Sequence, residues 1–105
     1  MNKDRLDYLY KNSLHLPMKA KWYDMIFYDN KREEYRTYNQ YWSKRILKGH
    51  YQFICLRYGY TKRVQIWTRT YFRIGKGKIR WGAPSDENVI IIGLGRLLYE
   101  GFIQQ

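Results

Sequence analysis

Val64-Gln65-Ile66-Trp67-Thr68-Arg69-Thr70-Tyr71-Phe72-Arg73-Ile74 alternates in side-chain type along its whole length. The even-numbered positions are aliphatic, aromatic or threonine, whereas the odd-numbered positions after Gln65 alternate Trp or Tyr with Arg. A period of two predicts a long β-strand whose successive side chains point to opposite faces. A turn at residues 59–63 precedes this strand, and Gly75 and Gly77 end it.

Further strands are predicted on both sides of this one. They cover residues 13–18, closed or bent by Pro17, then 31–37, 51–58 and 88–98. Gly93 and Gly95 are points at which the last strand could break. Helices are predicted at residues 4–11, from Ala20 to a turn at Asp29-Asn30, and at 40–47 before Gly49. We therefore expect an α+β barrel of five to six strands with two or three short flanking helices.

The chain is strongly basic. It has 105 residues, of which 20 are Lys or Arg and 9 are Asp or Glu, so its formal net charge is +11. Such a charge attracts polyanions, and their binding weakens as the salt concentration rises. Solubility alone is the alternative explanation, but arginines interspersed with aromatic residues favour nucleic acid. With 12 Tyr and 4 Trp, several rings should remain on the surface, where they suit base stacking.

Several classes of protein are disfavoured by what the sequence contains. A single cysteine, Cys55, allows no intrachain disulfide, so we expect a buried structural thiol and a cytoplasmic protein. Residues 1–12 are too polar for a secretory signal, and the apolar run at 89–94 is too short to span a membrane. His15 and His50 have no partners at ligand spacing, so we expect no metal and no other cofactor.

Asp29-Asn30-Lys31-Arg32-Glu33-Glu34-Tyr35-Arg36 places two acids among three bases on one short predicted strand. Lys31 and Arg36 are five positions apart, so an ideal strand would point them to opposite faces. Glu34 and Arg36 share a face and can pair, and a paired arginine is oriented for a phosphate or a base edge. Spacing alone favours a simpler interpretation, a solvated charged strand with weak surface ion pairs.

These residues resemble the G-x-K-x-x-E-x-R motif of the ASCH domain family, within the PUA-like superfamily. The chain matches at Lys31, Glu34 and Arg36 and has Asp29 in place of the motif's glycine. Further segments are similar in the same order along about residues 14–98, namely 21–26, 41–42, 57–60 and 81–83. Residues 13–105 are therefore identified as one ASCH-like domain, and residues 1–12 as an N-terminal extension.

The resemblance implies a PUA-like β-barrel with a cleft that binds RNA or a nucleotide, and with the motif on the wall of that cleft. Some members of the superfamily are enzymes, among them an acetylcytidine amidohydrolase group and proteins reported as ribonucleases. The amidohydrolase group has threonine where this chain has Glu34, which argues against transferring its chemistry.

Three hypotheses remain open. In the first, a nucleic-acid-binding module, Lys31 and Arg36 contact phosphate or a base edge and Glu34 accepts a base amino group. Stacking rings and an extended basic surface would come from Trp22, Tyr38, Trp42, Tyr60, Trp67, Arg57, Arg69 and Arg73. For Trp22 and Trp42, helical spacing favours a place in the core instead. For the face of Trp67, Arg69, Tyr71 and Arg73, an ordinary outer sheet face is the alternative.

In the second hypothesis the protein is an enzyme acting on RNA or a modified nucleoside. Lys31 would be its nucleophile or base, with a pKa lowered by crowded positive charge, and Glu34 its acid or base. In the third, the chain binds and blocks an acidic protein partner. Single-stranded RNA is the partner that the sequence favours, ahead of duplex or DNA.

Overall fold

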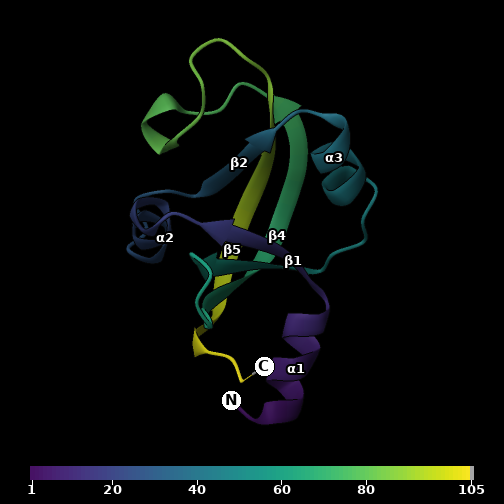
Figure 1. Ribbon diagram of the computed structural model, residues 1–105, viewed down its shortest axis with the longest axis vertical. Coiled ribbons are helices and arrows are strands. Elements are labelled where there is room, and N and C mark those ends of the chain that lie inside the picture. Colours follow the sequence, from purple (N-terminus) through teal and green to yellow (C-terminus); the bar gives the residue numbers. More distant parts are fainter. Residues whose placement is uncertain (105) are drawn as a thin grey trace.

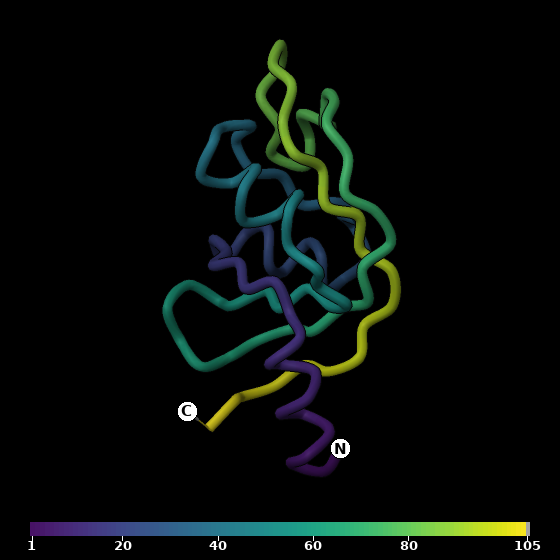
Figure 2. Tube along the Cα trace, turned by 90° about the vertical axis from the view of Figure 1, so that its right-hand side faces the viewer, coloured from purple at the N-terminus to yellow at the C-terminus, as the bar shows by residue number. Residues whose placement is uncertain are grey.

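Two long antiparallel strands form the centre of the sheet, β4 (Arg63–Gly75) and β5 (Val89–Phe102). The computed structural model describes residues 1–104. Figure 2 shows these two segments running side by side as one long curved ribbon. β4 confirms the strand predicted from the alternating stretch, and β5 extends beyond its predicted end at residue 98.

Three shorter strands complete a five-stranded sheet in the order β1-β3-β4-β5-β2 (Figure 1). β1 (Ser13–Met18) pairs with β3 (Phe53–Tyr58) in parallel, and every other pairing is antiparallel. β2 (Glu33–Thr37) pairs with β5. The sheet curls into a half-barrel, so its two edge strands, β1 and β2, are brought toward one another. The predicted α+β barrel-like architecture is confirmed at this level.

β5 continues through Gly93 and Gly95, so the strand does not break at these two glycines. A side chain at Gly93 would collide with Thr70 and with the ring of Tyr71 on the neighbouring strand. The glycines therefore let β4 and β5 approach closely, and the pairing absorbs the crowding through register shifts between Ile66 and Phe72.

Helix α1 (Lys3–Lys11) covers one side of the first half of β4, and the main core covers the other. Leu9 of α1 packs with Val64 and Ile66, while Trp67 packs in the main core. The expectation that Trp67 lies on an outer face with Arg69, Tyr71 and Arg73 is therefore wrong for Trp67, which is only 5% exposed. Its indole Nε1 donates a hydrogen bond to Gln65 Oε1 at 2.9 Å.

The remaining helices are short, and Figure 1 shows α2 and α3 at opposite flanks of the sheet. α2 (Ala20–Phe27) and α3 (Gln40–Trp42), which continues as a π-helical turn at Ser43–Leu47, match the helices predicted there. A 3-10 turn at Ile79–Trp81 was not predicted. Within residues 1–104, none of the helices combines the length and apolar character needed to cross a membrane.

Cys55 is fully buried in the small core beneath α1. Burial raises the pKa of its thiol to about 12, so the group stays protonated and unreactive near neutral pH. The prediction of a buried structural thiol is confirmed.

Tyr23 carries a testable pH effect, since its buried hydroxyl has no hydrogen-bond partner among the described residues. Burial raises the pKa of Tyr23 to about 12 from its ordinary value of 10. The stability that depends on its neutral form is complete below pH 10 and is lost as the pH rises through about 12. In Tyr23→Phe, the loss of unfolding free energy between about pH 8 and about pH 11 should be smaller by about 1 kcal/mol. Urea unfolding measures this, and an equal loss in both proteins would contradict it.

Candidate nucleic-acid interface

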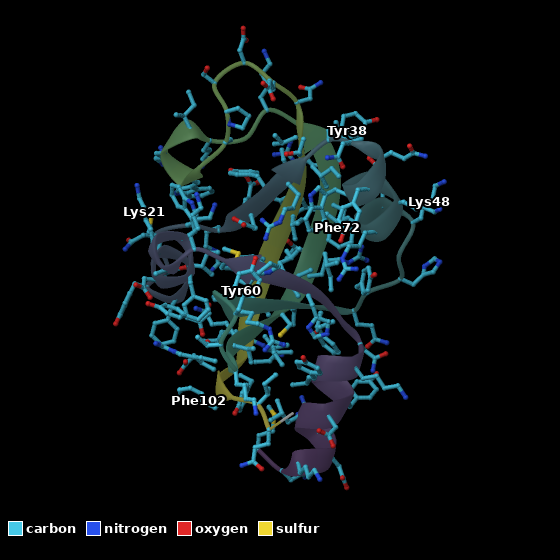
Figure 3. The ribbon with its side chains drawn as sticks, viewed as in Figure 1. Lys21, Tyr38, Lys48, Tyr60, Phe72 and Phe102 are labelled. Carbon is cyan, nitrogen blue, oxygen red and sulfur yellow. The ribbon has the colours of Figure 1, made fainter. Side chains whose placement is uncertain are left out.

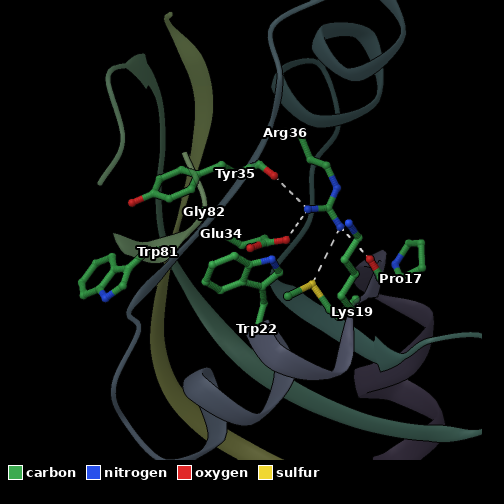
Figure 4. A pocket seen from close by; sticks show the side chains of 9 residues that line it. Pro17, Lys19, Trp22, Glu34, Tyr35, Arg36, Trp81 and Gly82 are labelled. Atoms are coloured by element: carbon green, nitrogen blue, oxygen red, sulfur yellow. Dashed lines mark hydrogen bonds and ion pairs between the residues drawn. The ribbon is translucent and has the colours of Figure 1, made fainter. Parts of the chain in front are cut away.

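A pocket of about 290 Å³ lies at the seam where the two edge strands of the sheet face each other. Its walls come from the end of β1, from α2, from β2 and from the 3-10 turn, as Figure 4 shows. We call it the seam pocket, and the residues that line it are Pro17, Met18, Lys19, Trp22, Glu34, Tyr35, Arg36, Trp81 and Gly82.

Glu34 is the electrostatic centre of the seam pocket. Its Oε1 lies 3.2 Å from Lys31 Nζ, and its Oε2 accepts a hydrogen bond from Arg36 Nη1. The Glu34 side chain is 8% exposed, so this carboxylate is held between two cations with little surrounding water. The remaining lone pairs of Glu34 are hydrogen-bond acceptors that it presents to the pocket.

Lys31 lies beneath the pocket and does not line it. Its side chain is 0% exposed, and its Nζ donates to the main-chain oxygen of Trp81. The same ammonium lies 5.1 Å from the ring centre of Trp22 and 4.7 Å from that of Tyr35. Lys31 therefore joins the carboxylate and three of the pocket's aromatic residues from below.

The pKa of Lys31 is lowered mainly by burial, and the Glu34 carboxylate opposes this effect. The expected direction is confirmed, but the expected cause, crowded positive charge, is only a minor contribution from Arg36. Because the ammonium is enclosed, the structure offers no approach for a substrate to Lys31 as a nucleophile or base.

Arg36 connects the two edges of the sheet. Besides Glu34, its guanidinium donates to the main-chain oxygens of Tyr35 and Pro17, each at 2.8 Å. Pro17 belongs to β1, so this one side chain bridges the seam from β2 (Figure 4). The guanidinium also lies 5.3 Å from the ring centre of Trp42 on α3. Arg36 is thus fixed by several partners at the seam between the two edge strands.

The interpretation of residues 31–37 as a solvated charged strand is wrong. β2 begins only at Glu33, and Lys31, Glu33 and Glu34 are all buried. Because Lys31 precedes the strand, it is not bound to the alternation that would place it opposite Arg36. The chain reaches this position through Asp29, whose φ of 64° is the left-handed conformation that glycine adopts most readily.

Trp22 and Trp81 form the aromatic walls of the seam pocket. Trp22 is partly buried, and a side chain added at Gly82 would lie 3.0 Å from its ring. Gly82 also has a φ of 102°, so only glycine fits here without strain. Trp81 is 9% exposed and has Lys78 Nζ 4.2 Å from its ring centre. Because lysine ammonium groups lie beside both rings, the aromatic walls of the pocket are surrounded by positive charge.

A second buried carboxylate, Glu33, holds the far wall in place. It accepts hydrogen bonds from the hydroxyls of Tyr35, at 2.8 Å, and Tyr71. The Tyr35 hydroxyl in turn accepts from the main-chain nitrogen of Lys78 at 3.0 Å. Burial raises the pKa of both tyrosines, so they remain donors across the physiological range. The loop that carries Trp81 is thereby tied to β2.

Of the residues predicted for binding, the structure brings Trp22, Glu34 and Arg36 together in the pocket, with Lys31 beneath them. Trp42 stands behind Arg36. The others lie outside the pocket lining, and they are Tyr38, Arg57, Tyr60, Trp67, Arg69 and Arg73.

These outlying residues have separate environments. Arg57 donates to the Tyr10 hydroxyl at 2.6 Å, and Arg73 lies 3.5 Å from Glu33. Tyr60 is 94% exposed in the turn between β3 and β4. Arg57 and Arg73 are therefore each engaged by a partner of their own.

The pocket residues that sequence reasoning missed are Pro17, Met18, Lys19, Tyr35, Trp81 and Gly82. Trp81-Gly82 did appear among the family-like segments, but nothing in the local pattern brought it to β2, about fifty positions earlier in the chain. The bond from Lys31 to the Trp81 carbonyl makes that connection, and it involves a main-chain atom that no side-chain pattern reveals.

Comparisons with known protein families, with curated proteins and with solved structures gave no match for this chain. Among residues 1–104, the His, Cys, Asp and Glu side chains form no group of three that could hold a metal ion.

The buried ion-pair partners Glu34 and Lys31 should differ in how much they contribute to the stability of the fold. Glu34→Gln leaves Lys31 fully buried without the anion that it pairs with, which should lower the free energy of unfolding by about 3–5 kcal/mol. Lys31→Met leaves Glu34 paired with Arg36 and removes one donor from the Trp81 carbonyl, so a loss of about 1–3 kcal/mol is expected.

Urea unfolding of both variants measures the difference. Lys76→Gln is the control, because its ion pair with Asp86 is exposed and should change stability by about 0–1 kcal/mol. A larger loss in Lys31→Met than in Glu34→Gln would contradict the central place given to the carboxylate.

Proposed function

We propose that this protein binds single-stranded nucleic acid, RNA in preference to DNA, and that the seam pocket receives one base or nucleotide. The observation that carries the proposal is a pocket walled by Trp22 and Trp81, with the Glu34 carboxylate inside it, on a chain of net charge +11. Aromatic walls suit the faces of a base, a fixed carboxylate suits its hydrogen-bonding edge, and the charge suits the backbone.

The size of the pocket supports a small target. Pockets for whole drug-sized ligands span about 300–1,000 Å³, and the seam pocket, at about 290 Å³, lies at the lower limit. A single unstacked base fits this range, whereas the bases of a duplex are stacked and paired inside the helix. Single strands are therefore the favoured form.

Each lining residue has a distinct part in the proposal. The partly buried ring of Trp22 stacks on the base, and Lys19, exposed at the rim, contacts a phosphate. Glu34 keeps lone pairs beyond those used by Lys31 and Arg36, and these accept from a base amino group. Lys31 and Arg36 act as positioning residues, since their ion pairs with Glu34 fix the orientation of this carboxylate.

The preference for RNA and the assignment of the curled sheet to the PUA-like type rest on the resemblance in the Lys31, Glu34 and Arg36 motif. The positive φ at Asp29 supports that resemblance, since it occurs at the position where the motif has glycine. The bridging of both sheet edges by Arg36 also agrees with a barrel that closes at the motif.

Fluorescence anisotropy with labelled single-stranded RNA, DNA and duplex at low salt tests the proposal. Trp22→Leu keeps an apolar side chain in the wall but removes the stacking surface, so it should weaken single-strand binding by about 1–3 kcal/mol. Phe102→Ala is the matched control, because it removes a ring that is 68% exposed and lies outside the lining of the seam pocket; Figure 3 shows it well below Lys21 of α2. No detectable binding by the wild-type protein, or equal losses in both variants, would refute the pocket as the base site.

The bases themselves offer a second test. Cytosine carries an amino group where uracil carries a carbonyl oxygen. Because the Glu34 carboxylate accepts from the first and repels the second, an oligocytidine should bind more tightly than an oligouridine of the same length. Equal affinities in the same anisotropy assay would remove Glu34 from the set of base contacts.

A further inference from the structure

The distribution of charge along the chain is uneven. Residues 35–85 contain no Asp or Glu, and twelve Lys and Arg lie within them. Several of these cations are neutralised by acids from outside the segment, as Arg36 is by Glu34 and Arg73 by Glu33. Within residues 1–104, seven exposed cations of this segment form no ion pair, so their charge faces solvent. Four of them are Lys44, Arg45, Lys48 and Arg69, and the others are Lys62, Lys78 and Arg80.

Three of these four cations share one hollow beside α3. Lys44, Arg45 and Lys48 line a shallow depression of about 390 Å³ together with the rings of Tyr41 and Tyr51. Lys48 lies on the side of the molecule opposite Lys21 of α2 (Figure 3). Tyr41 is 63% exposed, so this hollow offers both charge and an open aromatic face.

A second hollow, of about 520 Å³, continues from the first. Tyr51 and Gly49 line both, and the second adds His50 and Arg69. The ring of Tyr51 lies directly against the backbone of Gly49, which places it between the two depressions. The two hollows therefore form one surface, which we call the α3 track, made of Tyr41, Lys44, Arg45, Lys48, Tyr51 and Arg69.

The α3 track begins next to the seam pocket. Arg36 lines the pocket, and its guanidinium lies 5.3 Å from the ring centre of Trp42. On the other side of this contact, Trp42 and Tyr41 meet edge to face with ring centres 4.9 Å apart. Arg36 and Trp42 thus connect the pocket to the track.

We propose that the α3 track binds the phosphates of nucleotides that flank the one in the seam pocket, so that the ligand is a strand passing from the pocket over α3. This inference rests on the proposed function. An acidic protein surface would also meet these unpaired cations, and it is one of the outcomes that the experiment distinguishes. Rings interleaved with cations match a single strand, whose bases stack while its phosphates are neutralised.

The test is the salt dependence of binding to a labelled single-stranded octacytidine RNA, for which the logarithm of affinity falls linearly with that of salt concentration. The track variant replaces Lys44, Arg45 and Lys48 with Gln. It should reduce the slope by about two units, because each phosphate contact on a single strand contributes about 0.7. At low salt its affinity should fall about tenfold or more.

The matched control replaces Lys3, Arg5 and Lys11 of α1 with Gln, which lowers the net charge by the same three units on exposed residues. Its slope should remain close to that of the wild-type protein. Equal slopes in the track and control variants would overturn the track and leave the pocket standing, since net charge alone would then explain the salt effect. Unfolding midpoints of both variants confirm that each is folded.

Two further arms separate the remaining outcomes. Trp22→Leu should weaken binding with the slope unchanged, which distinguishes loss of the pocket from loss of the track. Poly-glutamate is the second probe. If it binds as tightly as the octanucleotide and loses affinity equally in the track variant, the surface serves an acidic protein and the inference fails. If the wild-type protein binds no oligonucleotide, the proposed function and the track fail together.

Discussion

The shared carboxylate of Glu34 is the interaction on which the candidate site depends. Lys31 and Arg36 reach it from opposite sides, one from beneath the pocket and one from the seam. Through Lys31 the carboxylate is linked to the carbonyl of Trp81, and through Arg36 to the carbonyl of Pro17. Three separate segments of the chain, at residues 31–36, at Trp81 and at Pro17, therefore meet around a single anion. A buried charge holds such segments together because the free-energy cost of its desolvation must be offset by partners in fixed positions.

The elements of the fold were accessible from the sequence because they depend on local periodicity. The alternation at residues 64–74 predicted β4, and the helical spacing of Trp22, Met25 and Ile26 predicted α2. What failed was the environment of individual residues. Trp67 obeys the alternation but is buried, because α1 and the main core cover both sides of this half of β4. Which side of a strand is buried depends on segments that are distant in the sequence, and local periodicity does not reveal them.

The candidate site was predictable only in part, for the same reason. Glu34 and Arg36 are two positions apart on one strand, so their pairing followed from spacing. The burial of Lys31 could not be inferred, since it depends on a carbonyl about fifty residues away and on a left-handed residue that ends the local pattern. Trp81 belonged to one of the segments that carried the resemblance, but no role could be assigned to it from the sequence. Its place in the pocket wall is visible only in the three-dimensional structure.

The seam also bears on how this chain avoids pairing with its own copies. A sheet with open edges presents free donors and acceptors on which a second chain can add a strand. β1 and β2 are the edges here. At Pro17 the β1 edge has no N–H to offer, and the carbonyl of the same residue is already occupied by Arg36. A strand arriving at this point finds neither a donor nor a free acceptor, and it meets a charged guanidinium. The side chain that joins the two edges of the half-barrel thereby also leaves less of the β1 edge open to a second copy of the chain.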